Sequence, residues 1–194
     1  MTSWIAPTAV PVGDIMAASE DALRVDDFQY LYDHRHDVLY IDRTQTTLAN
    51  STTETTVATY TVPAGMLSSN GILTFRALIR GKCTSANNNQ ITMKIKYGGT
   101  SFGSLLSEPA GATPNLQEIW GTLVANGATN AQVGIVQTIP AMLATENTRN
   151  PRSVYADLAI DSTVAQDLIL TLANGRLNAD ASWTYFYFVV FGLP

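Results

Sequence analysis

Apolar and polar side chains alternate along most of the chain after residue 43, and a period of two is typical of strands that bury one face. The alternation is strongest in residues 71–80, GILTFRALIR, and in residues 90–99, QITMKIKYGG. Residues 182–191, SWTYFYFVVF, are apolar on both faces and predict a strand that is covered on each side. Weaker alternation predicts five more strands, at Thr55–Val62, Ile119–Ala125, Gln132–Ile139, Val154–Ile160 and Asp167–Ala173.

The eight predicted strands are separated by turn signals, and no amphipathic helix of useful length follows residue 43. This pattern predicts a mainly β protein, an antiparallel β-sandwich of jelly-roll type. Asn-Gly pairs favour tight turns, and of the three pairs only Asn126-Gly127 has predicted strands close on both sides. Cys83 is the single cysteine, so no internal disulfide is expected, and a chain of 194 residues can bury a sufficient core without one.

The first 43 residues differ from the rest in charge and pattern. They hold eight acidic and three basic residues, a net charge of -5, whereas the remaining acidic and basic residues balance. WIAPTAVPVGD, with two prolines and a glycine, predicts an extended lead, and an apolar stripe predicts one helix over about Ser19 to Tyr32. We therefore expect two parts, an N-terminal attachment arm at 1–43 and a sandwich at 44–194.

Charge and hydropathy exclude two classes of partner. Only 14% of the residues are charged, where a soluble domain carries about 25%. A body whose charges sum to zero has no basic stripe for phosphates, so no nucleic-acid partner is expected. No run approaches the roughly 18 apolar residues of a membrane span, and the N-terminus lacks a signal-peptide pattern, so no membrane partner is expected either.

Ser101 lies in a G-x-S-x-G match, Gly99 to Gly103, which is the pattern of a hydrolase nucleophile elbow. That elbow requires a helix directly after the serine, and SLLSEPAGATP does not predict one. Both histidines precede Ser101, whereas that enzyme class places its histidine last. We therefore interpret Ser101 as a turn serine and predict no catalytic residue, no enzyme activity and no cofactor.

His34 and His36 lie one residue apart in DHRHD, between two aspartates. On an extended segment both imidazoles would share a face and could bind a divalent metal, whereas on a helix they would point apart. A solvated helix end is the favoured interpretation, so no metal site is predicted within one chain. Copies that meet on a symmetry axis would be the exception.

Trp4, Trp120 and Trp183 are the three tryptophans of the chain. Tryptophan rings either fill cores or serve as platforms on which sugars stack. Packing is the favoured role for all three.

The N-terminal segment SWIAPTAVPVGDIMAASEDALRVDDFQYLYD resembles the N-terminal segments of bacteriophage virion proteins. The matching positions are Trp4, Pro7, Gly13, Asp14, Ala17, Ala18, Leu23, Asp26 and Leu31, while Ala22 stands where many such segments have asparagine. The body resembles the polar jelly rolls of phage head fibres, capsid decoration proteins and tail tips. Together the two resemblances cover most of the chain.

The resemblance implies a non-enzymatic structural protein of the virion, made in the host cytoplasm and located on the capsid surface. It implies a homotrimer and a capsid decoration, or cement, protein that binds the major capsid protein lattice and stabilises the shell. The alternative is a head-fibre or tail-tip module that contacts a host surface receptor. Trp4, Ile5 and Val10 are expected as apolar anchors of the arm. Trp183, Tyr185 and Tyr187 of the aromatic last strand are the expected trimer contact, because neither face of that strand can be left in water.

Overall fold

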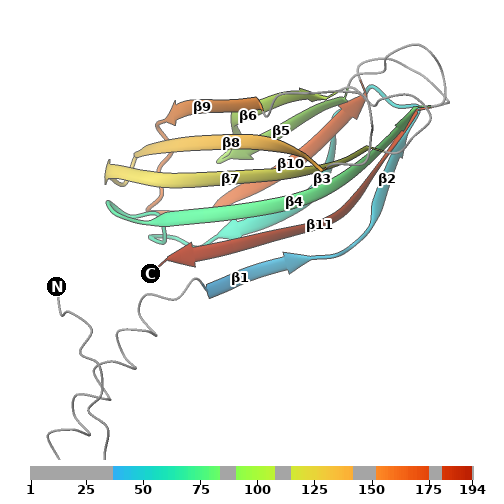
Figure 1. Cartoon of the computed structure of the whole chain (residues 1–194). Coiled ribbons are helices and arrows are strands. Elements are labelled where there is room, and N and C mark those ends of the chain that lie inside the picture. The colour runs from blue at the N-terminus through green and yellow to red at the C-terminus, as the bar shows by residue number, and fades with distance from the viewer. Residues whose placement is uncertain (1–36, 84–90, 108–114, 142–151, 175–180, 194) are drawn as a thin grey trace, which may run out of the picture.

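The described residues form two antiparallel sheets stacked as a sandwich (Figure 1). The computed structural model describes residues 37–83, 91–107, 115–141, 152–174 and 181–193. Within these ranges all regular structure is β, and no helix is long and apolar enough to span a membrane. The strands are β1 (Asp37–Asp42), β2 (Thr46–Ala49), β3 (Thr55–Val62), β4 (Ile72–Cys83), β5 (Ile91–Tyr97), β6 (Thr100–Ser107), β7 (Asn115–Ala128), β8 (Ala131–Ala141), β9 (Arg152–Leu158), β10 (Gln166–Asn174) and β11 (Ala181–Leu193).

The order of the strands confirms a jelly roll. One sheet contains β2-β11-β4-β7 and the other β3-β10-β5-β6, so that β2 pairs with β11, β3 with β10, β4 with β7 and β5 with β6. This nested pairing, in which successive members of these eight strands lie in opposite sheets except at the β5–β6 hairpin, is the arrangement of an eight-stranded jelly roll. Three more strands extend the first sheet to seven: β1 joins β11 at one edge, and β8 and β9 follow β7 at the other.

The core lies between the inner faces of the two sheets, as the alternation predicts. In β4 the side chains of Leu73, Phe75, Ala77 and Ile79 are all buried, and in β5 those of Met93, Ile95 and Tyr97 are buried. Phe75 of the large sheet meets Phe102 of the small sheet edge to face, with ring centroids 6.2 Å apart. The two sheets are therefore joined through apolar and aromatic contacts.

Two glycines make room for these rings. Gly121 pairs with Phe75 in the β4–β7 ladder, and a Cβ at position 121 would overlap the Phe75 ring. Gly134 of β8 lies against Phe102 in the same way. Because an aromatic ring occupies the space that a side chain would need, these glycines are required for packing.

The β5–β6 hairpin corrects the sequence interpretation of residues 98–107. Gly98 and Gly99 both have positive φ, 54° and 79°, and form a two-residue turn of the kind that glycine favours. A strand, β6, follows directly, where the sequence pattern predicts no strand and Ser101 is interpreted as a turn serine. Ser101 is thus a strand residue beside the turn.

The β7–β8 hairpin forms where the Asn126-Gly127 pair predicts one, but its turn lies further along the chain. Ala128 pairs with Ala131, so Thr129 and Asn130 occupy the turn. Gly127, with φ 77°, lies instead in an irregularity of β7 between Ala125 and Ala128.

The boundary between the arm and the sandwich also needs correction. β1 comes from the segment assigned to the arm, yet it pairs with the C-terminal half of β11, while β2 pairs with the N-terminal half. The sandwich therefore includes Asp37–Asp42, which the sequence pattern assigns to the arm. Residues 1–36, which include the predicted helix and the anchors Trp4, Ile5 and Val10, lie outside the described residues.

Candidate interaction surface

The outer face of the seven-stranded sheet carries four of the five exposed large apolar side chains of the described residues. The described residues include five exposed large apolar side chains: Val38 (53%), Ile41 (49%), Ile135 (39%), Tyr155 (76%) and Val164 (53%). The first four lie on this face, and Val164 lies in the loop before β10. An exposed apolar area gathered on one face, unlike scattered single residues, is typical of an interaction site.

The strand register shows how these residues share one face. One row of partners runs across the sheet through Val38, Phe191, Thr74, Thr122, Ile135 and Tyr155. The next row runs through Ile41, Val189, Arg76, Trp120, Gln137 and Ser153. Both rows alternate with the buried residues of β4 and β7, so their side chains point away from the core.

A groove of about 610 Å³ lies across these two rows. Its lining includes Thr74 and Thr122 from the two central strands, with Phe191 of β11 and Ile135 of β8 beyond them. Arg76, Trp120 and Gln137 of the next row complete it. Because threonine is smaller than its neighbours along the row, the centre of the row is lower than its ends, and this difference in size makes the groove.

Aromatic rings on this face hold charged groups in place. The guanidinium carbon of Arg76 lies 3.5 Å from the centroid of the Trp120 ring, and that of Arg80 lies 5.3 Å from the Phe186 ring. The Tyr187 hydroxyl donates a hydrogen bond to Oε1 of Glu118 at 3.4 Å. Burial raises the pKa of Tyr187, and the nearby carboxylate of Glu118 raises it further. The aromatic side chains thus fix the orientation of the two guanidinium groups and of the Glu118 carboxylate on a face that is otherwise largely apolar.

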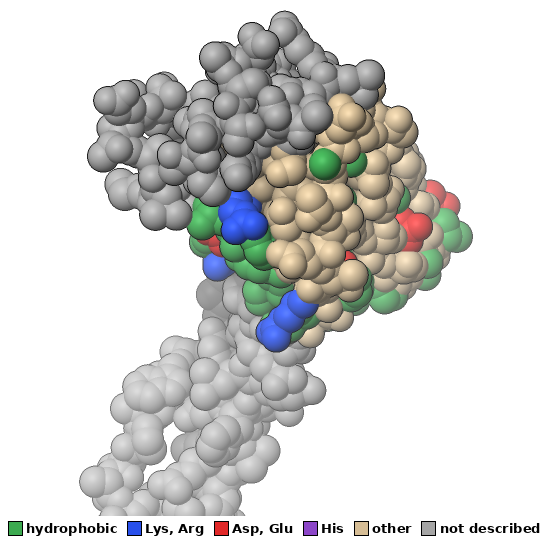
Figure 2. Space-filling view, turned by 90° about the vertical axis from the view of Figure 1, so that its right-hand side faces the viewer, with side chains coloured by type: hydrophobic (Ala, Val, Ile, Leu, Met, Phe, Trp, Pro, Cys, Tyr) green, Lys and Arg blue, Asp and Glu red, His purple; other side chains and the backbone are tan. Residues whose placement is uncertain are grey.

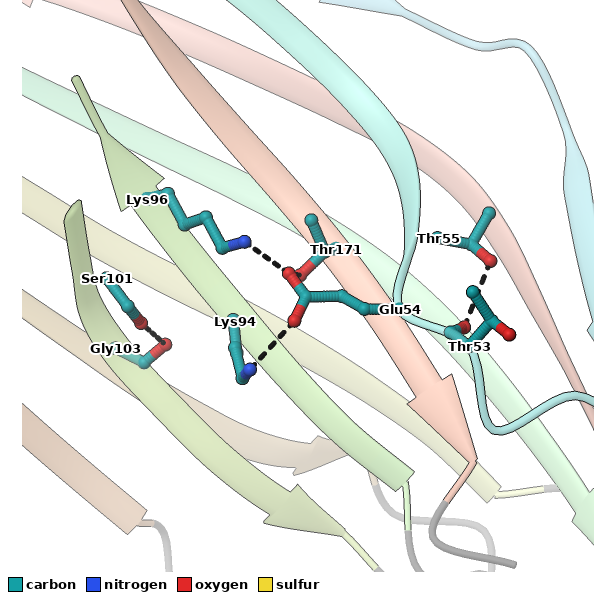
Figure 3. A network of polar contacts seen from close by, with 8 residues as sticks. All are labelled: Thr53, Glu54, Thr55, Lys94, Lys96, Ser101, Gly103 and Thr171. Carbon is teal, nitrogen blue, oxygen red and sulfur yellow. Dashed lines mark hydrogen bonds and ion pairs between the residues drawn. The ribbon is translucent and has the colours of Figure 1, made fainter. Parts of the chain in front are cut away.

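The outer face of the four-stranded sheet is polar by contrast. Its central feature is Glu54, whose carboxylate forms ion pairs with Lys94, at 2.7 Å, and with Lys96, and accepts a hydrogen bond from Thr171 Oγ1 at 3.0 Å (Figure 3). Hydrogen bonds from the two lysines lower the pKa of Glu54 from 4.5 to about 2. A carboxylate so firmly ionised, with its acceptors occupied, is a structural cross-link and is unsuited to donating a proton.

Charge is scarce on the visible surface as well. Figure 2 views the sandwich from the end at the right of Figure 1, and between the grey segments most of the surface is tan, with isolated Lys, Arg, Asp and Glu side chains. The outer faces of the two sheets differ in their side chains: four exposed large apolar side chains lie on the large sheet, whereas ion pairs and a threonine hydroxyl surround Glu54 on the small sheet.

The aromatic last strand differs from its predicted pattern. Trp183 and Tyr185 are fully buried in the core, so their assignment to an outer contact face is wrong. The register shifts between Tyr185 and Tyr187, and the extra residue brings Phe188 into the core and leaves Tyr187 on the outer side. Of the three residues expected at the trimer contact, Tyr187 alone has an outward-facing side chain.

The structure places the other predicted candidates as follows. Ser101 Oγ donates to the carbonyl of Gly103 at 3.4 Å, and β6 continues where a nucleophile elbow would need a helix. Both histidines, His34 and His36, lie outside the described residues. Within the described ranges no cluster of three or more His, Cys, Asp or Glu could hold a metal ion.

The tryptophans divide between core and surface. Packing is confirmed for Trp183, whereas Trp120 is half-buried on the outer face and lines the groove; Trp4 lies outside the described residues. The sequence did contain a signal for Trp120, because it alternates with the buried Ile119 and Gly121 and shares the phase of Glu118 and Thr122.

No protein-family model and no curated protein matches the sequence. Among solved structures the chain is similar to the CBM2 module of the evolved Dit of Lactobacillus casei BL23 phage J-1, with 12% identity, a TM-score of 0.36, and coverage of 69% of this chain and 67% of that one. It is also similar to the infectious bursal disease virus VP2 subviral particle, with 12% identity, a TM-score of 0.35, and coverage of 82% of this chain and 41% of that one. Similarity this low establishes neither a ligand nor an activity for this chain.

Proposed function

We propose that the chain is a non-enzymatic structural protein of a phage virion, a capsid decoration protein that forms a homotrimer and binds the major capsid protein lattice. The observation that carries this proposal is the apolar area along the β1–β11 border of the large sheet. Val38 and Ile41 are about half exposed there, next to Val189 and close to Tyr187. A second copy would bury these groups, and protein contacts of this kind combine an apolar centre with a polar rim.

The contrast between the two sheets supports a molecule with one attached and one free side. The hydroxyls and paired charges around Glu54 are suited to water, whereas the large sheet carries four of the five exposed large apolar side chains of the described chain. A shell protein that must pack on its neighbours and also face solvent requires this division.

Residues 1–36 act as the attachment arm in this proposal. Trp4, Ile5 and Val10 are the apolar anchors, and the net negative charge of the N-terminal segment opposes a basic area of the capsid subunits. The resemblance of this segment to phage virion proteins supports the role. No nucleic acid, membrane or cofactor takes part.

The second candidate is a head-fibre or tail-tip module that contacts a receptor on the host surface. The groove around Trp120 favours it, since decoration alone requires no binding groove. Jelly rolls serve both capsids and lectins, so the fold does not separate the two candidates.

Cryo-electron microscopy of the particles that carry the chain tests the proposal. Copies at local threefold positions over the whole shell are expected for a decoration protein, and copies at a single vertex or at the tail would favour the second candidate.

A matched experiment adds the full chain, or the chain without residues 1–36, to shells that lack it. The deletion stops before β1, so the sandwich should stay folded while decoration is lost. Equal binding by both proteins would contradict the role of the arm.

A further inference from the structure

The groove on the large sheet has a mixed lining that distinguishes it from a simple apolar contact area. Thr74 and Thr122 lie side by side across the β4–β7 ladder at its centre, and both are only partly buried. The Phe191 ring lies on one side of this pair, next to Thr74, and the Ile135 side chain lies on the other, next to Thr122. Hydroxyls therefore lie between apolar walls.

This combination suits a sugar ring, which has apolar C–H faces and hydroxyls around its edge. The walls can pack on the C–H faces, while the threonine hydroxyls and the Gln137 amide can each donate and accept hydrogen bonds. The volume, about 610 Å³, lies within the range of roughly 300 to 1,000 Å³ of small-molecule sites. A groove open to solvent, unlike a closed cavity, accommodates an internal unit of a longer glycan.

Arg76 adds a positive charge at one end of the groove. Its side chain is exposed and lies over the Trp120 ring, and no carboxylate of the described residues forms an ion pair with it. Stacking on an aromatic ring orients the planar guanidinium and leaves its N–H groups at the edge free to donate. A carboxylate is the group that such a donor fork pairs with best.

We propose that this groove binds an oligosaccharide that carries a carboxylate, such as a uronic-acid or sialic-acid unit, with the carboxylate on Arg76 and the sugar ring over Thr74 and Thr122. The site would give a virion protein an affinity for acidic surface glycans. The groove lies over β4, β7 and β8 and reaches β11 at Phe191, which pairs with Val38 of β1. The inference rests on the lining of the groove and not on decoration of the shell.

A protein partner fits the groove less well. A flat apolar partner surface would bury Arg76, Gln137 and the threonine hydroxyls, and each buried polar group without a partner carries a free-energy penalty. A glycan brings hydroxyls that can satisfy these groups one by one. The polar content of the groove thus favours a sugar.

Calorimetric titration of the full-length chain tests the inference with two matched pairs of probes. Oligogalacturonate is compared with its uncharged methyl ester, and sialyllactose is compared with lactose. At least one acidic probe should bind about tenfold more tightly than its neutral counterpart, and added salt should weaken that binding. Failure of both acidic probes to bind, or equal affinity for the charged and uncharged members of each pair, would overturn the proposal.

Two arginine variants on the same strand locate the site. Arg76→Gln should lower the affinity for the acidic probe about tenfold, whereas Arg80→Gln should change it less than twofold, because Arg80 lies over Phe186 and outside the groove. Both side chains are exposed, so both variants should unfold at the temperature of the unchanged protein. Equal loss of affinity in the two variants would show nonspecific attraction and would contradict the assigned site.

Discussion

The side-chain amide of Gln132 pairs with the backbone of Ile160 in both directions. It donates from Nε2 to the Ile160 carbonyl at 3.0 Å and accepts from the Ile160 N–H at 3.2 Å, and the same Nε2 also donates to the carbonyl of Thr129. Ser162 continues this contact, because its hydroxyl donates to Thr129 O at 2.6 Å and also reaches Leu67 O. One end of the sandwich is thus held by side chains that satisfy loop backbone groups.

Replacement of Gln132 by leucine should therefore destabilise the sandwich. The side chain is buried, and an apolar group of similar size leaves the N–H and the carbonyl of Ile160 without this partner, at a cost of about 2–3 kcal/mol in the free energy of unfolding. Urea unfolding measures the change. Gln137→Leu on the outer face of the same strand is the control and should alter stability by less than about 0.5 kcal/mol. Similar losses in both variants would contradict the role of Gln132.

Glu54 should make stability depend on pH in the acid range. Its pKa is lowered from 4.5 to about 2 in the folded protein, so protonation favours the unfolded state. The stabilisation is complete above about pH 4.5 and is lost as the pH falls toward 2. It should amount to no more than about 1 kcal/mol, because the ion pairs are partly exposed.

Glu54→Gln tests this pH dependence by urea unfolding at several pH values. The variant should be less stable than the unchanged protein near neutral pH, and the difference should shrink between pH 4.5 and 2. Thr59→Ala, at an exposed position of β3 and without a titratable group, is the control, and its stability difference from the unchanged protein should be constant over this range. Parallel curves for Glu54→Gln and the unchanged protein would show that the lysine contacts do not lower the pKa.

Gly121 and Phe75 should be energetically coupled. Gly121→Ala places a methyl group in the space of the Phe75 ring and should cost about 1–3 kcal/mol, the range for overpacked cores. Phe75→Leu removes the ring and destabilises through a cavity. The double variant should lose less stability than the sum of the two single variants, as measured by denaturant unfolding. Additive losses would mean that the methyl group is accommodated in another way.

Two valines with the same exposed fraction provide a test of the proposed homotrimer. Val38 lies on the β1 border, and Val164 lies in the loop before β10, each 53% exposed. Val38→Lys should convert the trimer to monomers because it places a charge in the contact, while Val164→Lys should remain trimeric. Sedimentation equilibrium at micromolar concentration distinguishes these states. A monomeric unchanged protein would refute the trimer.

The alternation of side chains predicts strands correctly even where it is weak. The predicted strand Thr55–Val62 has the same bounds in the structure. β6 was missed because its glycines and serines have low strand propensity, and pairing with β5 supplies the order that propensity does not. β1 was missed because its sequence, DVLYID, has four consecutive apolar residues without alternation and lies within the acidic N-terminal segment.

The interaction surface was harder to predict than the strands. A bulge in β11 reverses which residues face outward, and no residue type in SWTYFYFVVF marks its position. The groove depends on register across four strands, since Phe191, Thr74, Thr122 and Ile135 become neighbours only when the sheet has formed. A single sequence contains the periodicity of each strand but not their alignment.

The nested pairing of the jelly roll has a consequence for synthesis of the chain on the ribosome. β5 and β6 can pair as soon as both have emerged, but β2 and β3 must wait for β11 and β10, which are translated last. Until then both strands are exposed to water and to other nascent chains. Their sequences, TTLA and TTVATYTV, are rich in threonine. A threonine-rich strand that is exposed to water aggregates less readily than a continuous apolar strand. Threonine in β2 and β3 should therefore lower the tendency of the unfinished chain to aggregate, while it still permits strand pairing at the end.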